Sequence, residues 1–471
     1  MLFDDVLIPI VWRVDIAERE TRSAQARAMI SDLERRGVAL VATSFVDNSG
    51  IARVKSVPLR RLPQLAAWGV GFSPSFDYFR FDDWLAAPVS GEGPVGDLRI
   101  VPDLQRLVPL AAQPGWAWAP GSRYAPDGEE HPGCTRSLLG RLNEALAADG
   151  LRVSTAVELE WVISAGPGDA FVPAVIGPAY GLARLSGAAD YAREVVGALL
   201  AQKIDVLQFH PEYASGQFEL SVAPESPVAA ADTSVLVRST IRSVGLAHGL
   251  RTSFSPKVEV DGVGNGGHVH LSLWRDERNL MTGGGGPHGL TSEGEAFTAG
   301  ILARLPALLA LGAPSVASYL RLVPSRWAGA YACWGLENRE AALRLVAGSA
   351  GSADWAANVE VKCVDLTANP YLLLAGLLAA GAAGMSGRLR LPEPVDVDPA
   401  ALAPEELARR GIHRVPENLH AAVDALTADD VLRRALGSSL VGAVLAVRSS
   451  EVDRFAHASP EEVVTATRWT H

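Results

Sequence analysis

Residues 262–272 read Gly-Val-Gly-Asn-Gly-Gly-His-Val-His-Leu-Ser, a glycine-rich loop that runs directly into a strand-like alternation. Because successive side chains of a strand point to opposite faces, His268, His270 and Ser272 are predicted to share one face. A single histidine is most often structural, but two at this spacing behind a flexible loop indicate a metal or ligand site. We therefore expect the fold to place its chemistry here.

Paired carboxylates lie in a second alternating segment, residues 153–163. As one strand, this segment would place Glu158 and Glu160 on one face and apolar side chains on the other. Like charges so close raise each other's pKa unless a cation lies between them, so the pair indicates a divalent metal or an acid–base role. The alternative is the solvated face of an edge strand.

Further charged residues follow the same logic. In residues 210–219, Glu212 and Glu219 flank a glycine-containing turn, which lets both carboxylates return to one point. Glu360 and Lys362 share a face of Asn-Val-Glu-Val-Lys. Less regular stretches hold three arginines, for which a surface ion pair is the simpler interpretation: Arg321, Arg339 and Arg344.

Composition limits the class of protein. The 471 residues are 48% hydrophobic and 20% charged, with no run of eighteen uncharged apolar residues, which predicts two or three globular domains and no membrane partner. A net charge of −11 argues against nucleic acid as a partner. The three cysteines lack Cys-x-x-Cys spacing and the N-terminus begins with an acid pair, so we expect a reducing cytoplasm and no export signal.

Texture changes along the chain predict an α+β protein in three parts. A helical segment, residues 1–37, precedes a small β-rich domain, residues 38–120, and a large domain, residues 121–471. Residues 371–385 are apolar but too short to span a bilayer, so we expect a buried helix. The large domain is predicted to alternate strands and helices, among them strands at 153–164, 217–222, 268–274 and 359–366 and helices at 135–149, 191–201, 233–248 and 295–311.

Taken in order, these motifs resemble those of glutamine synthetase. The similarity runs from about Val38 to Phe455 and carries Glu-x-Glu, Glu…Gly-Gln-x-Glu, Gly-x-Gly-Asn-Gly-Gly-His-x-His-x-Ser-Leu, Arg-Leu-Val-Pro, Glu-Asn-Arg…Arg and Val-Glu-Val. The resemblance implies a small N-terminal β-grasp domain and a large catalytic domain with a curved antiparallel sheet flanked by helices. It also implies a homo-oligomer, a dodecamer of two stacked hexameric rings with each site between neighbouring subunits.

The resemblance further implies roles for individual residues. Two Mg²⁺ or Mn²⁺ ions per site would be held, the first by Glu160, Glu212 and Glu219, the second by Glu158, His268 and Glu360. The nucleotide, ATP, would face His270, Ser272, Arg339 and Arg344. The amino-acid substrate would meet Arg321, Gly264 and Lys362, and the residues expected to act in catalysis are Arg339, Arg321 and Glu360.

Several positions depart from the pattern of ammonia-using members. Trp327 stands where they carry an acid, and Ser73 stands where an aspartate reaches across the subunit interface, so both belong to the expected substrate site. Asp77 could supply a substitute acid. On the amino-acid side, Lys362 replaces an arginine and Val263 an asparagine, which leaves open whether glutamate is the acid.

The interpretation that follows is an ATP-dependent ligase. It would activate the γ-carboxylate of glutamate as an acyl phosphate and join it to an amine larger than ammonia, because an aromatic wall suits a larger amine. The alternatives are a true glutamine synthetase, a non-catalytic scaffold of the same family and an unrelated two-metal hydrolase. The sequence names neither the amine nor the group that deprotonates it.

Overall fold

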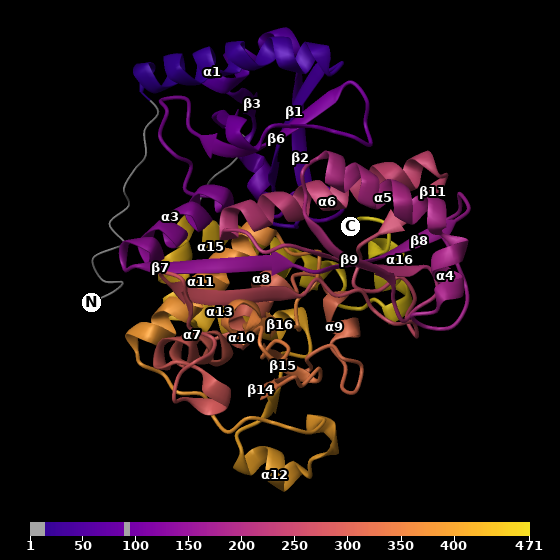
Figure 1. Ribbon diagram of the computed structural model, residues 1–471, viewed down its shortest axis with the longest axis vertical. Coiled ribbons are helices and arrows are strands. Elements are labelled where there is room, and N and C mark those ends of the chain that lie inside the picture. The colour runs from indigo at the N-terminus through magenta and orange to yellow at the C-terminus, as the bar shows by residue number, and fades with distance from the viewer. Residues whose placement is uncertain (1–14, 89–94) are drawn as a thin grey trace.

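The computed structural model describes residues 15–88 and 95–471, so the first fourteen residues of the predicted helical segment lie outside it. It confirms the α+β class. Helix α1 (Ile16–Arg35) and an N-terminal sheet form one end of the molecule, the large helix-and-strand part forms the middle, and α12 (Pro404–Arg409) lies at the opposite end (Figure 1).

The N-terminal sheet begins within the β-rich segment predicted from residue 38. Its strand order is β2-β1-β6-β4-β3, with β5 beside β6, and only the central β1–β6 pair is parallel. The strands are β1 (Leu40–Val46), β2 (Ala52–Pro58), β3 (Val70–Phe72), β4 (Leu98–Pro102), β5 (Val108–Pro109) and β6 (Trp116–Tyr124). Since β6 continues past residue 120, it crosses the boundary predicted there, and the domain limits stay a prediction.

Apolar spacing in α1 explains how this sheet is covered. Ala26 and Leu33 of α1 are buried with Val41 of β1 and with Leu62 and Leu65 of α2 (Leu62–Trp68). The polar remainder of α1 is exposed or half-buried. This layer therefore has a core of its own, separate from the main one.

Two further sheets carry the large part of the chain. One has the order β11-β8-β10-β9 and the other β13-β12-β16-β15-β14-β17, with β7 paired to β12. Their strands are β7 (Leu151–Val157), β8 (Leu159–Ala165), β9 (Val206–Pro211), β10 (Gln217–Val222), β11 (Leu250–Ser253), β12 (Val269–Arg275), β13 (Arg278–Asn279), β14 (Tyr331–Leu336), β15 (Ala341–Val346), β16 (Asn358–Val361) and β17 (His413–Arg414). All their pairs are antiparallel except β14–β15.

The single strand predicted at residues 153–164 is wrong in one respect. The strand is interrupted at Glu158, so that β7 belongs to the seven-stranded sheet and β8 to the four-stranded sheet. Leu159 begins β8 opposite Leu220 of β10, while Val157 ends β7 opposite Val269 of β12. One continuous stretch of sequence therefore joins the two sheets.

Helices pack around these sheets, and most predicted ones are present. They are α3 (Thr135–Ala148), α4 (Leu182–Gly187), α5 (Ala189–Ala201), α6 (Pro227–Ala247), α7 (Ser292–Ala303), α8 (Leu305–Gly312), α9 (Ser318–Arg321), α10 (Ala353–Ala356), α11 (Pro370–Ser386), α13 (Leu419–Ala428), α14 (Asp430–Leu436), α15 (Ser438–Arg454) and α16 (Pro460–Thr467). The predicted helix at 295–311 is instead two helices, α7 and α8, bent by 71° where Arg304 precedes Leu305-Pro306. Proline lacks the N–H that a continuous helix needs, which explains the bend.

Helix α11 is the buried helix predicted from its apolar sequence. It packs against α3, α6, α7, α8 and α14, and almost all of its side chains are buried. Across residues 15–88 and 95–471, no single helix is long and apolar enough to cross a bilayer. Only the bent pair α7 and α8 reaches that length and composition together.

Asn369 connects this core to the N-terminal sheet. Its Oδ1 accepts hydrogen bonds from the backbone N–H groups of Tyr371 and Leu372 and so caps α11, at N···O distances of 3.0 and 3.2 Å. Its Nδ2 donates to the carbonyls of Val46 and Asp47, at 3.0 and 3.1 Å. One fully buried side chain therefore satisfies backbone groups of two separate layers.

The first prediction concerns this contact. Asn369→Ala should lower the free energy of unfolding by about 2–4 kcal/mol, because it removes the helix cap and two hydrogen bonds to backbone carbonyls of the N-terminal sheet. Asn418→Ala is the matched control, since Asn418 caps α13 from an exposed position and should cost only about 1 kcal/mol. Urea denaturation of both variants measures the difference, and equal losses would contradict the linking role.

Candidate active site

The interruption between β7 and β8 places Glu158 at the centre of the site. Backbone hydrogen bonds still hold this stretch to the chain before β12: Glu158 N–H donates to the His268 carbonyl (2.8 Å) and Glu160 N–H to the Gly266 carbonyl (3.4 Å). Glu158 Oε1 lies 2.6 Å from His268 Nδ1, and Glu160 Oε1 lies 3.8 Å from His268 Nε2. Although the two glutamates do not share one regular strand face, both reach His268.

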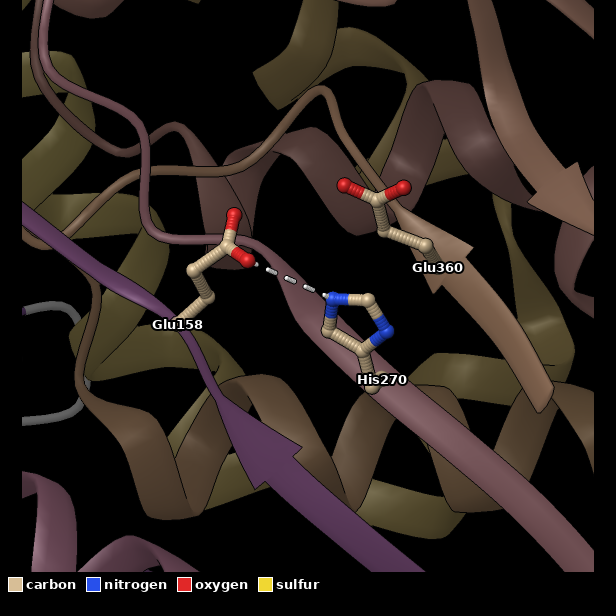
Figure 2. A group of neighbouring side chains, drawn as sticks. All are labelled: Glu158, His270 and Glu360. Atoms are coloured by element: carbon tan, nitrogen blue, oxygen red, sulfur yellow. Dashed lines mark ion pairs between the residues drawn. The ribbon is translucent and has the colours of Figure 1, made fainter. Parts of the chain in front are cut away.

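Glu360 extends this cluster from β16. Figure 2 shows Glu158 and Glu360 on either side of His270, which projects from β12. The Nε2 of His270 lies 3.9 Å from Glu158 Oε2, and Glu360 Oε1 lies 3.4 Å from His268 Nδ1. Neighbouring strands therefore bring both histidines and both carboxylates to one place, as the shared face of His268 and His270 predicted.

A second cluster lies on the adjoining sheet. Glu219 of β10 stands opposite Glu160 of β8, and His210 Nε2 lies 3.4 Å from Glu212 Oε1 and 3.7 Å from Glu219 Oε1. Sequence reasoning missed His210 as a candidate, although its position two residues before Glu212 on β9 could have indicated it. Gln217 was missed as well, and its Nε2 donates to Glu160 Oε2 at 3.2 Å.

Electrostatics in this region reflect crowding of carboxylates. Burial, reinforced by Glu158, Glu160 and Glu212, raises the pKa of Glu219 to about 10. Against the opposing effect of burial, the hydrogen bond from His268 holds the pKa of Glu158 at about 2. The pKa of Glu360 is also lowered despite burial, chiefly by Lys362. Carboxylates this close to one another repel strongly, and a bound cation would relieve that repulsion.

The donor set fits a hard divalent cation. All six predicted ligands belong to groups whose oxygen or nitrogen atoms lie within 4.8 Å of one another, namely Glu158–His270–Glu360, Glu158–Glu160–His268 and His210–Glu212–Glu219. Carboxylate oxygens in this number are what Mg²⁺ and Mn²⁺ prefer. The division of the six residues between two ions stays a prediction, because Glu160 groups here with His268 rather than with Glu212 and Glu219.

Cations also surround Glu360. Arg344 Nη1 lies 3.1 Å from its Oε2 and Lys362 Nζ lies 3.0 Å from its Oε1, as expected for residues on one strand face. Arg321 is buried at the end of α9, donates through Nη2 to the Lys362 carbonyl at 2.9 Å, and leaves Nη1 without a hydrogen-bond partner. A buried unpaired donor of this kind is suited to a ligand carboxylate.

The residues expected at the nucleotide lie on β12, in the turn after β14 and, for Arg344, on β15. His270 and Ser272 are two residues apart in β12, and His270 Nδ1 lies 2.9 Å from Asn358 Oδ1. Ser272 Oγ accepts from the indole N–H of Trp274 at 2.8 Å. Arg339 lies in an exposed turn between β14 and β15. Their contacts with ATP stay a prediction.

Glycine is required where the loop passes the cluster. A Cβ added to Gly266 would lie 2.4 Å from His268 Nε2 and 3.0 Å from Glu160 Oε1. One added to Gly264 would lie 2.7 Å from Arg321 Cγ. The glycines therefore let the backbone approach the site closely, which is consistent with the substrate role predicted for Gly264.

Two aromatic side chains lie next to Glu212 in the chain or in space. Trp327 is about half exposed, and its ring packs edge-on against Tyr213, which directly follows Glu212, with centroids 6.4 Å apart. Its backbone N–H donates to Glu340 Oε1 at 2.9 Å. Sequence reasoning did not single out Tyr213 or Glu340.

The possible substitute acid, Asp77, is not available. It is buried, forms an ion pair with Arg123 and lies 2.8 Å from His131 Nε2, and although burial opposes this, Arg123 keeps its pKa lowered. Ser73 accepts the N–H of Ser75 at 3.2 Å and caps a short turn of the N-terminal domain. The expectation for Asp77 was therefore wrong, since its charge is already paired within the chain.

Comparison with known proteins places this geometry in a family. Residues 132–465 match the glutamine synthetase catalytic domain. The chain is 53% identical over 450 residues to a γ-glutamylpolyamine synthetase of Streptomyces coelicolor, covering 95% of this chain and 97% of that protein. It is 31% identical to a glutamate–methylamine ligase of Methyloversatilis universalis, covering 92% and 96%.

Solved structures agree. A crystal structure of a novel glutamine synthase homologue superimposes with a TM-score of 0.82 at 35% identity, covering 92% of this chain and 99% of that one. A GmaS/ADP complex gives 0.80 at 27% identity, covering 92% and 97%. The chain belongs to the glutamine synthetase family. The predicted enzyme class, an ATP-dependent carboxylate–amine ligase, is thereby confirmed, and the family uses ATP, a divalent metal ion, glutamate and an amine.

The second prediction follows from the pKa of Glu219. Because this pKa is raised above its unfolded value, the group stabilises the fold fully below about pH 4.5 and progressively less as pH rises toward 10. The melting temperature of metal-free protein should therefore fall from pH 6 to pH 9. The loss is at most about 1.4 kcal/mol per pH unit, and added Mg²⁺ should raise the melting temperature more at pH 9.

Glu219→Gln should flatten this dependence, whereas Glu405→Gln, at an exposed position in α12, should leave it unchanged. Differential scanning fluorimetry with and without EDTA provides the measurement. An unaltered pH slope in Glu219→Gln would show that the carboxylate cluster is not the source.

Proposed function

We propose that this chain is a γ-glutamyl-amine synthetase, an ATP-dependent ligase that joins glutamate to an amine larger than ammonia. One observation carries the proposal: the carboxylate–histidine clusters expected for acyl-phosphate chemistry are complete, while Trp327 stands where ammonia-using members carry an acid. The γ-glutamylpolyamine synthetase and the glutamate–methylamine ligase among the relatives support an organic amine as acceptor.

The site would work in two steps. A γ-carboxylate oxygen of glutamate attacks the γ-phosphorus of ATP and ADP leaves; the amine nitrogen then attacks the acyl carbon, phosphate departs with that oxygen, and the nitrogen loses a proton. Glu158, Glu160, Glu212, Glu219, His268 and Glu360 would hold Mg²⁺ or Mn²⁺, two ions per site. When bound, these cations offset the charge of the phosphates.

Side chains of the chain itself would position both substrates. Arg321, with its free buried Nη1, would bind the amino-acid carboxylate, assisted by the close backbone of Gly264. Lys362 would act as a point charge beside it rather than as a bidentate fork. Arg339 and Arg344 would face the nucleotide with His270 and Ser272, and Glu360 would keep Arg344 and Lys362 in place.

Assembly and location are part of the same proposal. The expected substrate residue Ser73 lies on the N-terminal domain and would complete a neighbouring subunit's site, which requires a ring, in this family two stacked hexamers. All three cysteines are free and buried, which supports a reducing cytoplasm.

The third prediction tests the acceptor. With ATP, glutamate and Mg²⁺, at least one primary alkylamine or hydroxyalkylamine should exceed ammonium in kcat/KM by about tenfold or more, because packing on Trp327 replaces the missing acid. Trp327→Ala should reduce kcat/KM for the larger amine more than for ammonium. Phosphate release across an amine panel is the measurement.

Glu160→Ala and His268→Ala are the controls for metal-dependent chemistry, and each should abolish phosphate release in a folded protein. If ammonium gives the highest kcat/KM, the chain is a true glutamine synthetase. A scaffold would release no phosphate with any amine, and a hydrolase would release it without one.

The fourth prediction concerns assembly. Light scattering should give a native mass many times the 49.7 kDa of one chain, because each site needs a neighbour's N-terminal domain. Dilution to monomers should abolish activity. A fully active monomer would overturn the shared site.

A further inference from the structure

Glu340 is a buried acid that the catalytic scheme above does not use. It lies just before β15, and its side chain is only 8% exposed. Its Oε1 accepts the Trp327 N–H, but its Oε2 is buried without a hydrogen-bond partner. An unsatisfied buried carboxylate oxygen is costly and is rarely retained without a partner.

The loop that covers Glu340 is the loop that carries Trp327. Ser325 and Trp327 both have positive φ values, 56° and 55°, which are strained for residues with side chains. Two carboxylates hold the loop in this shape: Glu340 through the Trp327 N–H, and Asp398, whose Oδ2 accepts from Ser325 Oγ at 2.7 Å. The Glu340 carboxylate therefore holds the backbone of the residue whose indole is about half exposed.

Glu340 is also connected to the metal-binding cluster. The loop ends at Gly329, where an added Cβ would lie 3.1 Å from Lys362 Cβ, and Lys362 Nζ is 3.0 Å from Glu360. Burial and, less strongly, the charge of Asp398 raise the pKa of Glu340, while the backbone N–H groups of Trp327 and Ser325 and the charge of Lys362 oppose that rise. The carboxylate thus contacts the Trp327 loop and is influenced by Lys362, which pairs with Glu360, and a cation beside it would stabilise its charged form.

We propose that Glu340 is the acceptor-site carboxylate and binds the second ammonium group of a diamine or polyamine that packs along Trp327. This inference rests on the proposed function. The attacking nitrogen must be neutral, but the other nitrogen of such an acceptor stays protonated, with a pKa near that of lysine, about 10.4. It needs a carboxylate at one end and an apolar surface for its methylene chain.

The other candidate acids are already paired. Asp77 is bound to Arg123 and His131, Asp398 is hydrogen-bonded to Ser325, and Glu212 belongs to the His210 cluster. Tyr213, which packs edge-on against Trp327, adds a second aromatic surface for a cationic chain. Glu340 alone among these acids combines contact with the Trp327 loop and a free oxygen.

Glu340→Gln separates charge from structure. The glutamine keeps an oxygen to accept the Trp327 N–H but removes the negative charge. The substrates are 1,4-diaminobutane and 1-aminobutane, which share a four-carbon chain and differ in the second nitrogen. We expect kcat/KM for the diamine to fall about ten- to a hundredfold, while kcat/KM for 1-aminobutane and the KM values for glutamate and ATP change less than about threefold.

Asp398→Asn is the matched control, because it removes a charge from the same loop support and keeps the acceptor for Ser325. It should leave the diamine-to-monoamine ratio within about twofold. If Glu340→Gln lowers kcat/KM equally for both amines, Glu340 only supports the loop and the proposal is wrong. A diamine-to-monoamine ratio of kcat/KM equal to that of the wild type would also overturn the proposal.

The wild-type ratio is informative without any variant. If 1-aminobutane is used as well as the diamine, the amine ligase activity stands and the Glu340 inference alone is wrong. If ammonium is the best acceptor, the proposed function itself fails, and this inference fails with it. Melting temperatures of the variants verify that the fold is retained.

Discussion

Repulsion among buried carboxylates is the constraint on which this site depends. Five carboxylates converge from β8, β10 and β16 and from the segments that follow β7 and β9, and their histidine and lysine neighbours offset only part of the charge: Glu158, Glu160, Glu212, Glu219 and Glu360. Such an arrangement is stable only in a scaffold rigid enough to oppose it, which the buried α11 and its surrounding helices provide. Repulsion at this site therefore lowers the free energy of unfolding, and binding of a cation would raise it again.

Much of the site could be predicted from the sequence because local residue patterns determine which side chains lie together. Alternation placed Glu360 beside Lys362, and the spacing of His268 and His270 predicted their common location. The break at Glu158 was missed because both halves of residues 153–164 are strand-like, and only pairing with β10 and β12 separates them. The bend at Arg304 carried a local signal, the following proline, which was not used.

Around Trp327, by contrast, contacts between residues distant in the sequence limited what could be predicted. The loss of acids at Trp327 and Ser73 is visible by resemblance, but what replaces them is not, because Glu340 is thirteen residues from Trp327 in the chain and meets it only through a strained loop. Asp77 misled for the same reason, since its partner Arg123 lies on β6. Long-range pairing decides which acids are free, and sequence spacing does not contain that information.

The position of Glu158 between two sheets couples ligand binding to the relative orientation of those sheets. A cation held by Glu158 together with Glu160 of β8 and Glu360 of β16 would contact carboxylates from both, so its binding free energy would also be the free energy of keeping the sheets at one mutual angle. Substitutions at a remote pairing such as β8–β11 could therefore change metal affinity without altering a single ligand. Affinity in this enzyme becomes a property of the interface between sheets as much as of its coordinating side chains.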